Sequence, residues 1–62
     1  MRYIIYSKAD NLYYTGKDCP DNGMAIFNRN IMAAKVYEDA EEAQRELVRL
    51  DRNGLIVTEY YR

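Results

Sequence analysis

The feature that most constrains the fold is a short amphipathic helix predicted over residues 40–52. Asp39 precedes it and is a residue type that caps helices, because its carboxylate accepts hydrogen bonds from the unpaired backbone N–H groups of the first turn. Glu42 stands three residues later, where its side chain can bond back to the Asp39 N–H. Gly54 suits a left-handed cap at the other end. The sequence therefore predicts a helix with both ends defined.

The apolar stripe of this helix is narrow. Ala40, Ala43, Leu47 and Leu50 recur at helical spacing, and charged residues occupy most of the remaining positions. An apolar stripe of this width allows the helix to pack against one face of one other secondary-structure element. No second segment of the chain has a helical period, so the neighbour is predicted to be a sheet built from residues on either side of the helix.

Three segments have the β-branched and aromatic composition of strands: residues 2–7, 12–15 and 55–61. The polar residues 8–11 predict a hairpin turn between the first two. Residues 32–37 are expected to extend into a further strand that leads to the helix. Residues 25–31 are compatible with a strand, a single helical turn or an ordered loop, and the sequence leaves these three open.

The element order is thus β-β-(β)-α-β within a single domain, residues 1–62. It predicts an α+β fold in which a small antiparallel or mixed sheet carries one helix on one face. Because the connection from the helix to the last strand is short, that strand is expected to pair near the first.

A core of 62 residues has a thin margin of stability, which small proteins supplement with disulfides, metals or oligomerisation. The chain has one Cys and no His, so neither an intramolecular disulfide nor a Cys/His zinc site can form. Oligomerisation is the supplement that remains, and we expect a homodimer.

Charge and hydropathy exclude several classes of partner. Nine basic and ten acidic residues leave a net charge of −1, which gives no general attraction to nucleic acid or to an anionic membrane. No run approaches the roughly 18 apolar residues of a membrane span. The N-terminal MRYIIY has the composition of a strand and lacks a charged and then apolar leader. We expect a cytoplasmic protein without membrane contact.

The layout also resembles a group of known proteins. An N-terminal hairpin, a loop, a strand that ends in an aromatic residue and a D-x-E-E-A helix start within AKVYEDAEEAQRELVRL are similar to small uncharacterised proteins of bacteriophages and prophages. The resemblance covers most of the chain. It implies a mobile genetic element as the source and the host cytoplasm as the place of action, and it assigns a role to no individual residue.

No side-chain arrangement in the sequence predicts catalysis. Cys19 lies in a Gly/Pro/Asp-rich loop, where a nucleophile would need a base or a lowered pKa. The chain has no His, and the neighbouring Asp18 and Asp21 are acids, which cannot activate a thiol as a nucleophile. Cys19 is therefore interpreted as an ordinary reduced cysteine, and we expect no catalytic residue and no enzyme.

Acidic residues do not predict a metal or cofactor site. Asp10, Asp18 and Asp21 lack the alternating oxygen ligands of a calcium loop and are interpreted as turn formers. Glu41, Glu42 and Glu46 are expected on the solvated outer face of the helix. The glycines form no phosphate-binding pattern, so no cofactor is expected.

Tyrosine is the unusual component, with seven Tyr against one Phe and no Trp. Both faces of the predicted hairpin strands are apolar, whereas one helix covers only one face. The tyrosines therefore either fill the core or form a binding surface, a role in which Tyr is enriched. An RNA platform of stacking tyrosines is opposed by the acidic balance. The predicted binding residues are Tyr3, Tyr6, Tyr13, Tyr14, Tyr60 and Tyr61.

These observations lead to a functional hypothesis. The protein is expected to be a non-enzymatic binding protein that inhibits a host enzyme or defence component by direct contact, with tyrosines in a homodimer interface. The alternative cover for the second sheet face is the segment 16–32 folded back across it. The alternative function is sequestration of a nucleotide-like small molecule in a pocket between protomers.

Overall fold

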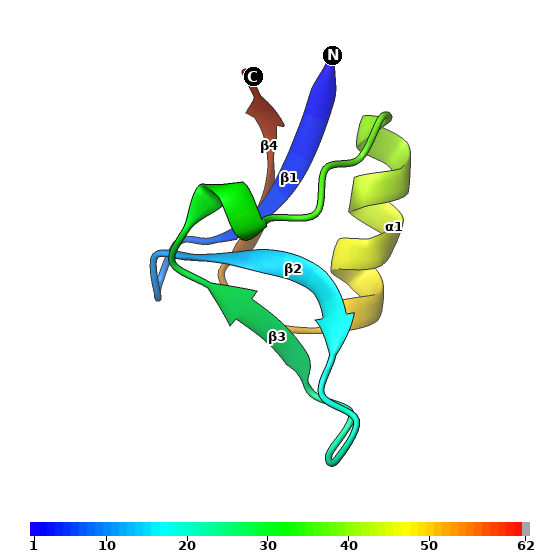
Figure 1. Ribbon diagram of the computed structural model, residues 1–62. Coiled ribbons are helices and arrows are strands. Elements are labelled where there is room, and N and C mark those ends of the chain that lie inside the picture. The colour runs from blue at the N-terminus through cyan, green and yellow to red at the C-terminus, as the bar shows by residue number, and fades with distance from the viewer. Residues whose placement is uncertain (62) are drawn as a thin grey trace.

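The computed structural model describes residues 1–61, and residue 62 lies outside them. It contains a four-stranded antiparallel sheet in the order β3-β2-β1-β4, with one α-helix against one face (Figure 1). This confirms the predicted α+β fold, and the last strand lies beside the first as expected. The elements are β1 (Arg2–Ser7), β2 (Leu12–Asp18), β3 (Ala25–Asn28), the 3-10 turn η1 (Ile31–Ala33), α1 (Ala40–Leu50) and β4 (Leu55–Tyr60).

The central strand β1 is paired unequally on its two sides. Along β4 the pairing runs the whole length of the strand, from Arg2 opposite Tyr60 to Ser7 opposite Leu55. Along β2 it is confined to the hairpin end, where Tyr6 lies opposite Tyr13. Beyond that point β2 diverges from β1 and curves beneath the C-terminal end of α1 (Figure 1).

The segment before the helix fills the gap between the diverging strands. Tyr3 and Tyr37 exchange two backbone hydrogen bonds, with N···O distances of 2.8 and 2.7 Å. On the other side, the Lys35 N–H donates to the Tyr14 carbonyl at 3.0 Å. The predicted strand over residues 32–37 is therefore wrong in extent: η1 occupies its first half, and a single bridge at Tyr37 is all that pairs with β1.

Residues 25–31, left open by the sequence, divide between β3 and the start of η1. Strand β3 pairs with β2 and so widens the sheet. Most of the segment 16–32 therefore lies in or beside the sheet and does not form a separate layer. Strand β2 is also longer than predicted, because it continues through an irregularity between Tyr14 and Asp18 at which Gly16 has a φ of +82°.

The helix begins where the sequence predicts. Asp39 is its N-cap, and the Asp39 Oδ1 accepts from the backbone N–H groups of Glu41 at 2.7 Å and Glu42 at 3.4 Å. The helix ends at Leu50, earlier than predicted, because Asp51 takes the left-handed conformation with a φ of 47°. The cap is thus Asp51, whereas Gly54 serves the turn into β4.

The core lies between α1 and the sheet. Its buried members are Ile5, Tyr14, Tyr37, Ala43 and Leu55. Leu47 and Leu50 pack against them from the helix, half-buried. Tyrosine therefore supplies much of the apolar area of the core. Among residues 1–61, no helix has the length and apolar character needed to cross a membrane.

The first prediction concerns the N-cap. Asp39→Ala should lower the free energy of unfolding by about 1 kcal/mol, because it removes the acceptor for two first-turn N–H groups. Asp39→Asn is the matched control and should stay within a few tenths of a kcal/mol of the original protein, since Asn also caps. Denaturant titration measures both, and an Ala variant as stable as the original would contradict the assignment.

The second prediction concerns the bend of β2. A Cβ added at Gly16 would lie 2.6 Å from the Lys35 Cδ and 2.9 Å from its Cβ, whereas one added at Gly23 would meet nothing within 4 Å. Both glycines have positive φ, so alanine at either position should cost about 1–2 kcal/mol. Gly16→Ala should cost clearly more than Gly23→Ala in thermal melts. Equal losses would mean that Lys35 moves aside freely.

Candidate binding surface of the sheet

The strand register divides the predicted tyrosines between the two faces of the sheet. Directly opposite residues share a face, and alternate residues along a strand point to opposite faces. Tyr6 lies opposite both Tyr13 of β2 and Ile56 of β4, while Ile4 lies opposite Thr58. We call the side away from α1 the tyrosine face; its members include Arg2, Ile4, Tyr6, Tyr13, Ile56, Thr58 and Tyr60.

The tyrosine face is partly accessible. Tyr6, Tyr13 and Tyr60 are half-buried, Ile56 is 39 % exposed, and Ile4 beneath them is buried. The rings of Tyr6 and Tyr13 have centroids 5.1 Å apart and planes tilted by 38°. The Tyr6 hydroxyl donates to the Asn11 Oδ1 at the hairpin turn, which fixes its ring. The only α-helix of the described residues packs on the opposite side of the sheet.

The other three predicted binding residues lie elsewhere. Tyr3 is half-buried and packs against the core beneath α1. Tyr14 is only 1 % exposed and belongs to the core between α1 and the sheet. Tyr61 follows β4, is 84 % exposed, and its hydroxyl donates to the Glu59 carboxylate at 2.5 Å. The structure therefore places Tyr6, Tyr13 and Tyr60 on one face, with Tyr6 and Tyr13 in contact and Tyr60 at the other end of the β1–β4 ladder, opposite Arg2. It separates these three from Tyr3, Tyr14 and Tyr61.

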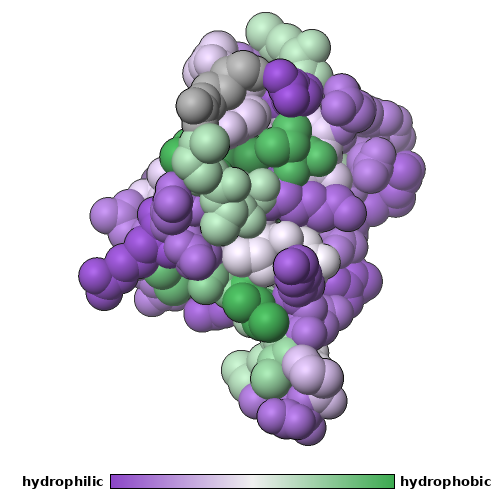
Figure 2. Space-filling model, in the orientation of Figure 1, coloured by the Kyte–Doolittle hydropathy of each residue, from purple (hydrophilic) through white to green (hydrophobic). Residues whose placement is uncertain are grey.

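The accessible apolar side chains belong mainly to the sheet and its loops. In Figure 2 they gather over η1 and the segment that follows it, while the outer surface of α1 at the right is hydrophilic. On the helix, the one large apolar side chain that is exposed is Val48, at 66 %.

A polar cluster joins the helix to β2 under the sheet bend. The Arg49 guanidinium donates to both oxygens of Glu46 at 2.9 Å and to the Tyr14 hydroxyl at 3.1 Å. The same Arg49 lies 3.9 Å from Asp18, and the Tyr14 hydroxyl lies 3.4 Å from both Glu46 and Asp18. The expectation that Glu46 belongs to the solvated outer face is wrong: it is half-buried and bonded to Arg49 and Tyr14.

These contacts shift the pKa values of the cluster. The hydrogen bonds from Arg49 hold the pKa of Glu46 below its usual range. Burial, and after it the nearby Asp18 and Glu46 carboxylates, raise the pKa of Tyr14 above its ordinary value of 10.0. Burial, followed by the charge of Glu46, raises the pKa of Tyr37 further. The cluster therefore holds charged Glu46 and Arg49 beside neutral tyrosines, which is the pattern of a structural clamp.

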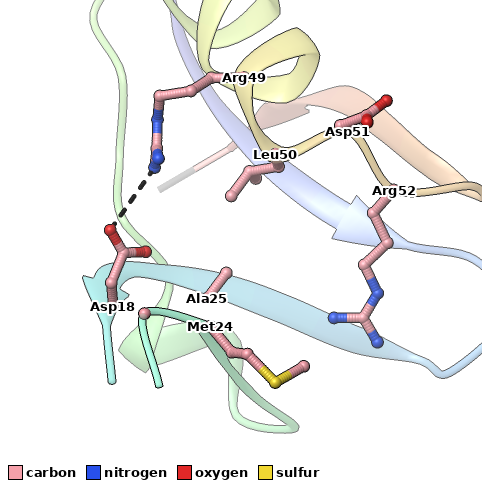
Figure 3. Close-up of a pocket in the computed structure, with 8 residues that line it drawn as sticks. Asp18, Met24, Ala25, Arg49, Leu50, Asp51 and Arg52 are labelled. Carbon is pink, nitrogen blue, oxygen red and sulfur yellow. Dashed lines mark ion pairs between the residues drawn. The ribbon is translucent and has the colours of Figure 1, made fainter. Parts of the chain in front are cut away.

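A cleft of about 480 Å³ opens between the β2–β3 loop and the end of α1 (Figure 3). Arg49 and Arg52 reach into it, but each has partners: Arg49 points toward Asp18, and Arg52 lies 3.2 Å from Asp10 and 4.6 Å from the centre of the Phe27 ring. The positive charge of the cleft is therefore already paired within the chain.

Of the three acids interpreted as turn formers, Asp10 and Asp21 lie in turns, whereas Asp18 is the last residue of β2, so its interpretation as a turn former is wrong. Asp10 accepts from the Ser7 hydroxyl and from Arg52, both at 3.2 Å. Cys19 is half-buried in the β2–β3 loop, where its N–H donates to the Met24 carbonyl at 2.7 Å. Among residues 1–61, no three His, Cys, Asp or Glu side chains are grouped so that they could hold a metal ion.

Comparison with known proteins adds no relative: no protein-family model, no curated protein and no solved structure matches this chain.

The third prediction separates two buried tyrosines. Tyr37→Phe should stabilise the protein by about 1 kcal/mol, because the Tyr37 hydroxyl is buried without a hydrogen-bond partner. Tyr14→Phe should destabilise it by a similar amount, because it removes the hydroxyl that accepts from Arg49. Denaturant titration at pH 7 measures both, and equal signs would contradict the assignment.

The same variants have a pH signature. Folding raises the pKa of Tyr14 and Tyr37, so the unfolded chain loses these protons more readily than the folded protein does. The free energy of unfolding therefore does not depend on these groups below the ordinary pKa of 10.0 and falls as the pH rises above it. Tyr37→Phe should therefore weaken the alkaline loss of stability more than Tyr61→Phe, whose hydroxyl is on the surface.

Proposed function

We propose that this protein is a non-enzymatic binding module that presents its tyrosine face to a protein partner in the cytoplasm. The observation that carries the proposal is that Tyr6, Tyr13 and Tyr60 all lie on the sheet face opposite α1, where Tyr6 and Tyr13 are in ring contact. Tyrosine combines a large ring with a polar hydroxyl, so it contributes strongly to protein interfaces while tolerating water before the partner binds.

The surrounding side chains favour a protein partner over nucleic acid. Ile4, Ile56 and Thr58 give the tyrosine face apolar contact area, and Arg2, opposite Tyr60, places one positive charge at its end. A nucleic-acid platform needs a groove of Lys and Arg along its stacking rings to contact successive phosphates, and one cation at the end of the face does not form such a groove. The net charge of −1 supports the same choice.

The non-enzymatic part of the proposal rests on how the reactive groups are used. Arg49 contacts both Glu46 and Asp18, and the Tyr14 hydroxyl contacts all three, so their charges serve the packing of α1 on β2. The one thiol, Cys19, has no imidazole to activate it, because the chain contains no His.

The resemblance to phage and prophage proteins suggests the class of partner. A small phage-encoded binder reaches its target in the host cytoplasm, so we propose a host enzyme or defence component that is inhibited by occupation of its surface. We also propose that the protein acts as a homodimer, since association supplements the thin stability margin of a 62-residue core.

The fourth prediction tests the tyrosine face. Affinity capture from bacterial lysate with the original protein should retain a partner that Tyr13→Ser and Tyr60→Ser both lose. Titration calorimetry with that partner, once purified, should show an affinity at least about tenfold weaker for each variant, a loss of about 1.4 kcal/mol.

Tyr61→Ser is the matched control, because it removes a tyrosine next to Tyr60 in sequence but away from the tyrosine face. It should bind as the original does. Thermal melts establish that each variant is folded. Equal capture by the face variants and the original would contradict the proposal. Recovery of a nucleotide-like molecule without any protein would support sequestration in its place.

A further inference from the structure

The outer edge of β4 carries a regular row of backbone groups. The Lys8 N–H donates to the Gly54 carbonyl at 2.9 Å, which sets the phase of the β1–β4 ladder. In an antiparallel pair, residues whose backbone N–H and C=O groups bond to the neighbouring strand alternate with residues whose backbone groups point away from it. The two bonds between Tyr3 and Tyr37 on the far side of β1 agree with that phase. Backbone groups of Ile56, Thr58 and Tyr60 therefore point to β1, and those of Leu55, Val57 and Glu59 point outward.

Nothing in the described part of the chain pairs with these outward groups. Strand β4 is the end of the sheet order, and its one pairing is with β1. Natural edge strands are usually protected by Pro, Lys, a bulge or short length. The six residues of β4, LIVTEY, have none of these four devices. A charged side chain is a further protective device, and Glu59 is the one charge that β4 carries. Strand β3, at the opposite edge, has four residues. The β4 edge is thus the side on which the sheet is open to extension.

The flank of α1 above this edge is also suited to a close neighbour. Glu46 and Arg49 turn toward Tyr14 of β2. Because an α-helix turns about 100° per residue, Gln44 and Val48 lie on the flank of α1 opposite to Glu46 and Arg49. That flank is on the β4 side, because β1 separates β2 from β4 in the sheet. Val48 is 66 % exposed and belongs to no core cluster. The helix flank beside the open edge therefore carries Gln44 and Val48, with Glu41 and Arg45 bordering Val48.

We propose that β4 pairs with β4 of a second copy of this chain, antiparallel across a two-fold axis centred on Val57. Leu55 of each copy then lies opposite Glu59 of the other, and Val57 lies opposite Val57. This is the one register in which all three outward residues pair among themselves. A shift that sets Glu59 opposite Glu59 would place two carboxylates together, which is unfavourable.

A second copy is the occupant that the edge fits best. A two-fold axis presents the same strand to itself, and antiparallel pairing follows from that symmetry. Every pairing in this sheet is already antiparallel. The proposal concerns the β4 edge and stands independently of partner binding at the tyrosine face.

The fifth prediction is a proline test of the edge. Light scattering at micromolar to millimolar concentration should give the original protein a mass of twice 7.3 kDa. Glu59→Pro should shift it to the monomer, because proline removes an outward N–H that makes no bond to β1. Glu59→Thr is the matched control: it also removes the carboxylate but keeps the N–H, so it should remain dimeric. Circular dichroism verifies that both variants are folded.

A cysteine test reads the register and does not depend on tolerance of proline. In the proposed dimer, residue 56 of one copy and residue 58 of the other form a non-hydrogen-bonded pair, whose Cα separation of about 4.5 Å suits a disulfide. The test uses a Cys19→Ser background so that the native thiol cannot react. A mixture of the Ile56→Cys and Thr58→Cys chains should therefore cross-link upon oxidation. Either chain alone should not.

Three results would overturn the proposal. The first is a concentration-independent monomer mass for the original protein. The second is a Glu59→Pro dimer as stable as the Glu59→Thr dimer. The third is cross-linking of the Thr58→Cys or Ile56→Cys chain alone in place of the mixture, which would place the two-fold axis elsewhere. Because partner capture is measured separately, failure of the dimer leaves the tyrosine-face proposal standing.

Discussion

The unequal pairing of β1 is the constraint on which the rest of the structure depends. Strand β1 pairs with β4 over its whole length, whereas its pairing with β2 ends at Tyr6 and Tyr13, and β2 then curves under the helix (Figure 1). Tyr37 bonds to Tyr3 in the gap, and the helix cap at Asp39 follows two residues later. The position of α1 is therefore set by these backbone bonds together with its apolar stripe.

The sequence predicted those elements whose formation depends on residues close to one another in the chain. The Asp39 cap, the polar turn of the β1–β2 hairpin and the β-branched run of β4 each identified an element from its own residues. Residues 32–37 could not be placed in this way, because they are held by two strands that separate only in the tertiary structure. The end of the helix was missed for a different reason: Asp51 takes a left-handed conformation that glycine usually occupies, so Gly54 was the stronger signal.

The candidate site was predictable in part. Alternation along each strand separates Tyr3 from Tyr6 and Tyr13 from Tyr14, so the division into two faces could be read from the sequence. Which face meets the helix could not, because it depends on how α1 is docked; Tyr14 was consequently assigned to a surface and lies in the core. The partners of Glu46 show the same limit, since Tyr14 is 32 residues away in the chain.

Edge pairing at β4 has a consequence for the tyrosine face. A two-fold axis that relates antiparallel neighbours stands perpendicular to the sheet, so both copies turn the same face to the same side. Ile56 of one copy would then adjoin Thr58 of the other, and the two tyrosine faces would merge into one continuous surface. Such a dimer leaves the face open and doubles it, whereas dimerisation through the face would cover it. A partner with two matching sites, or a long groove, would gain from this arrangement by avidity without any new contact.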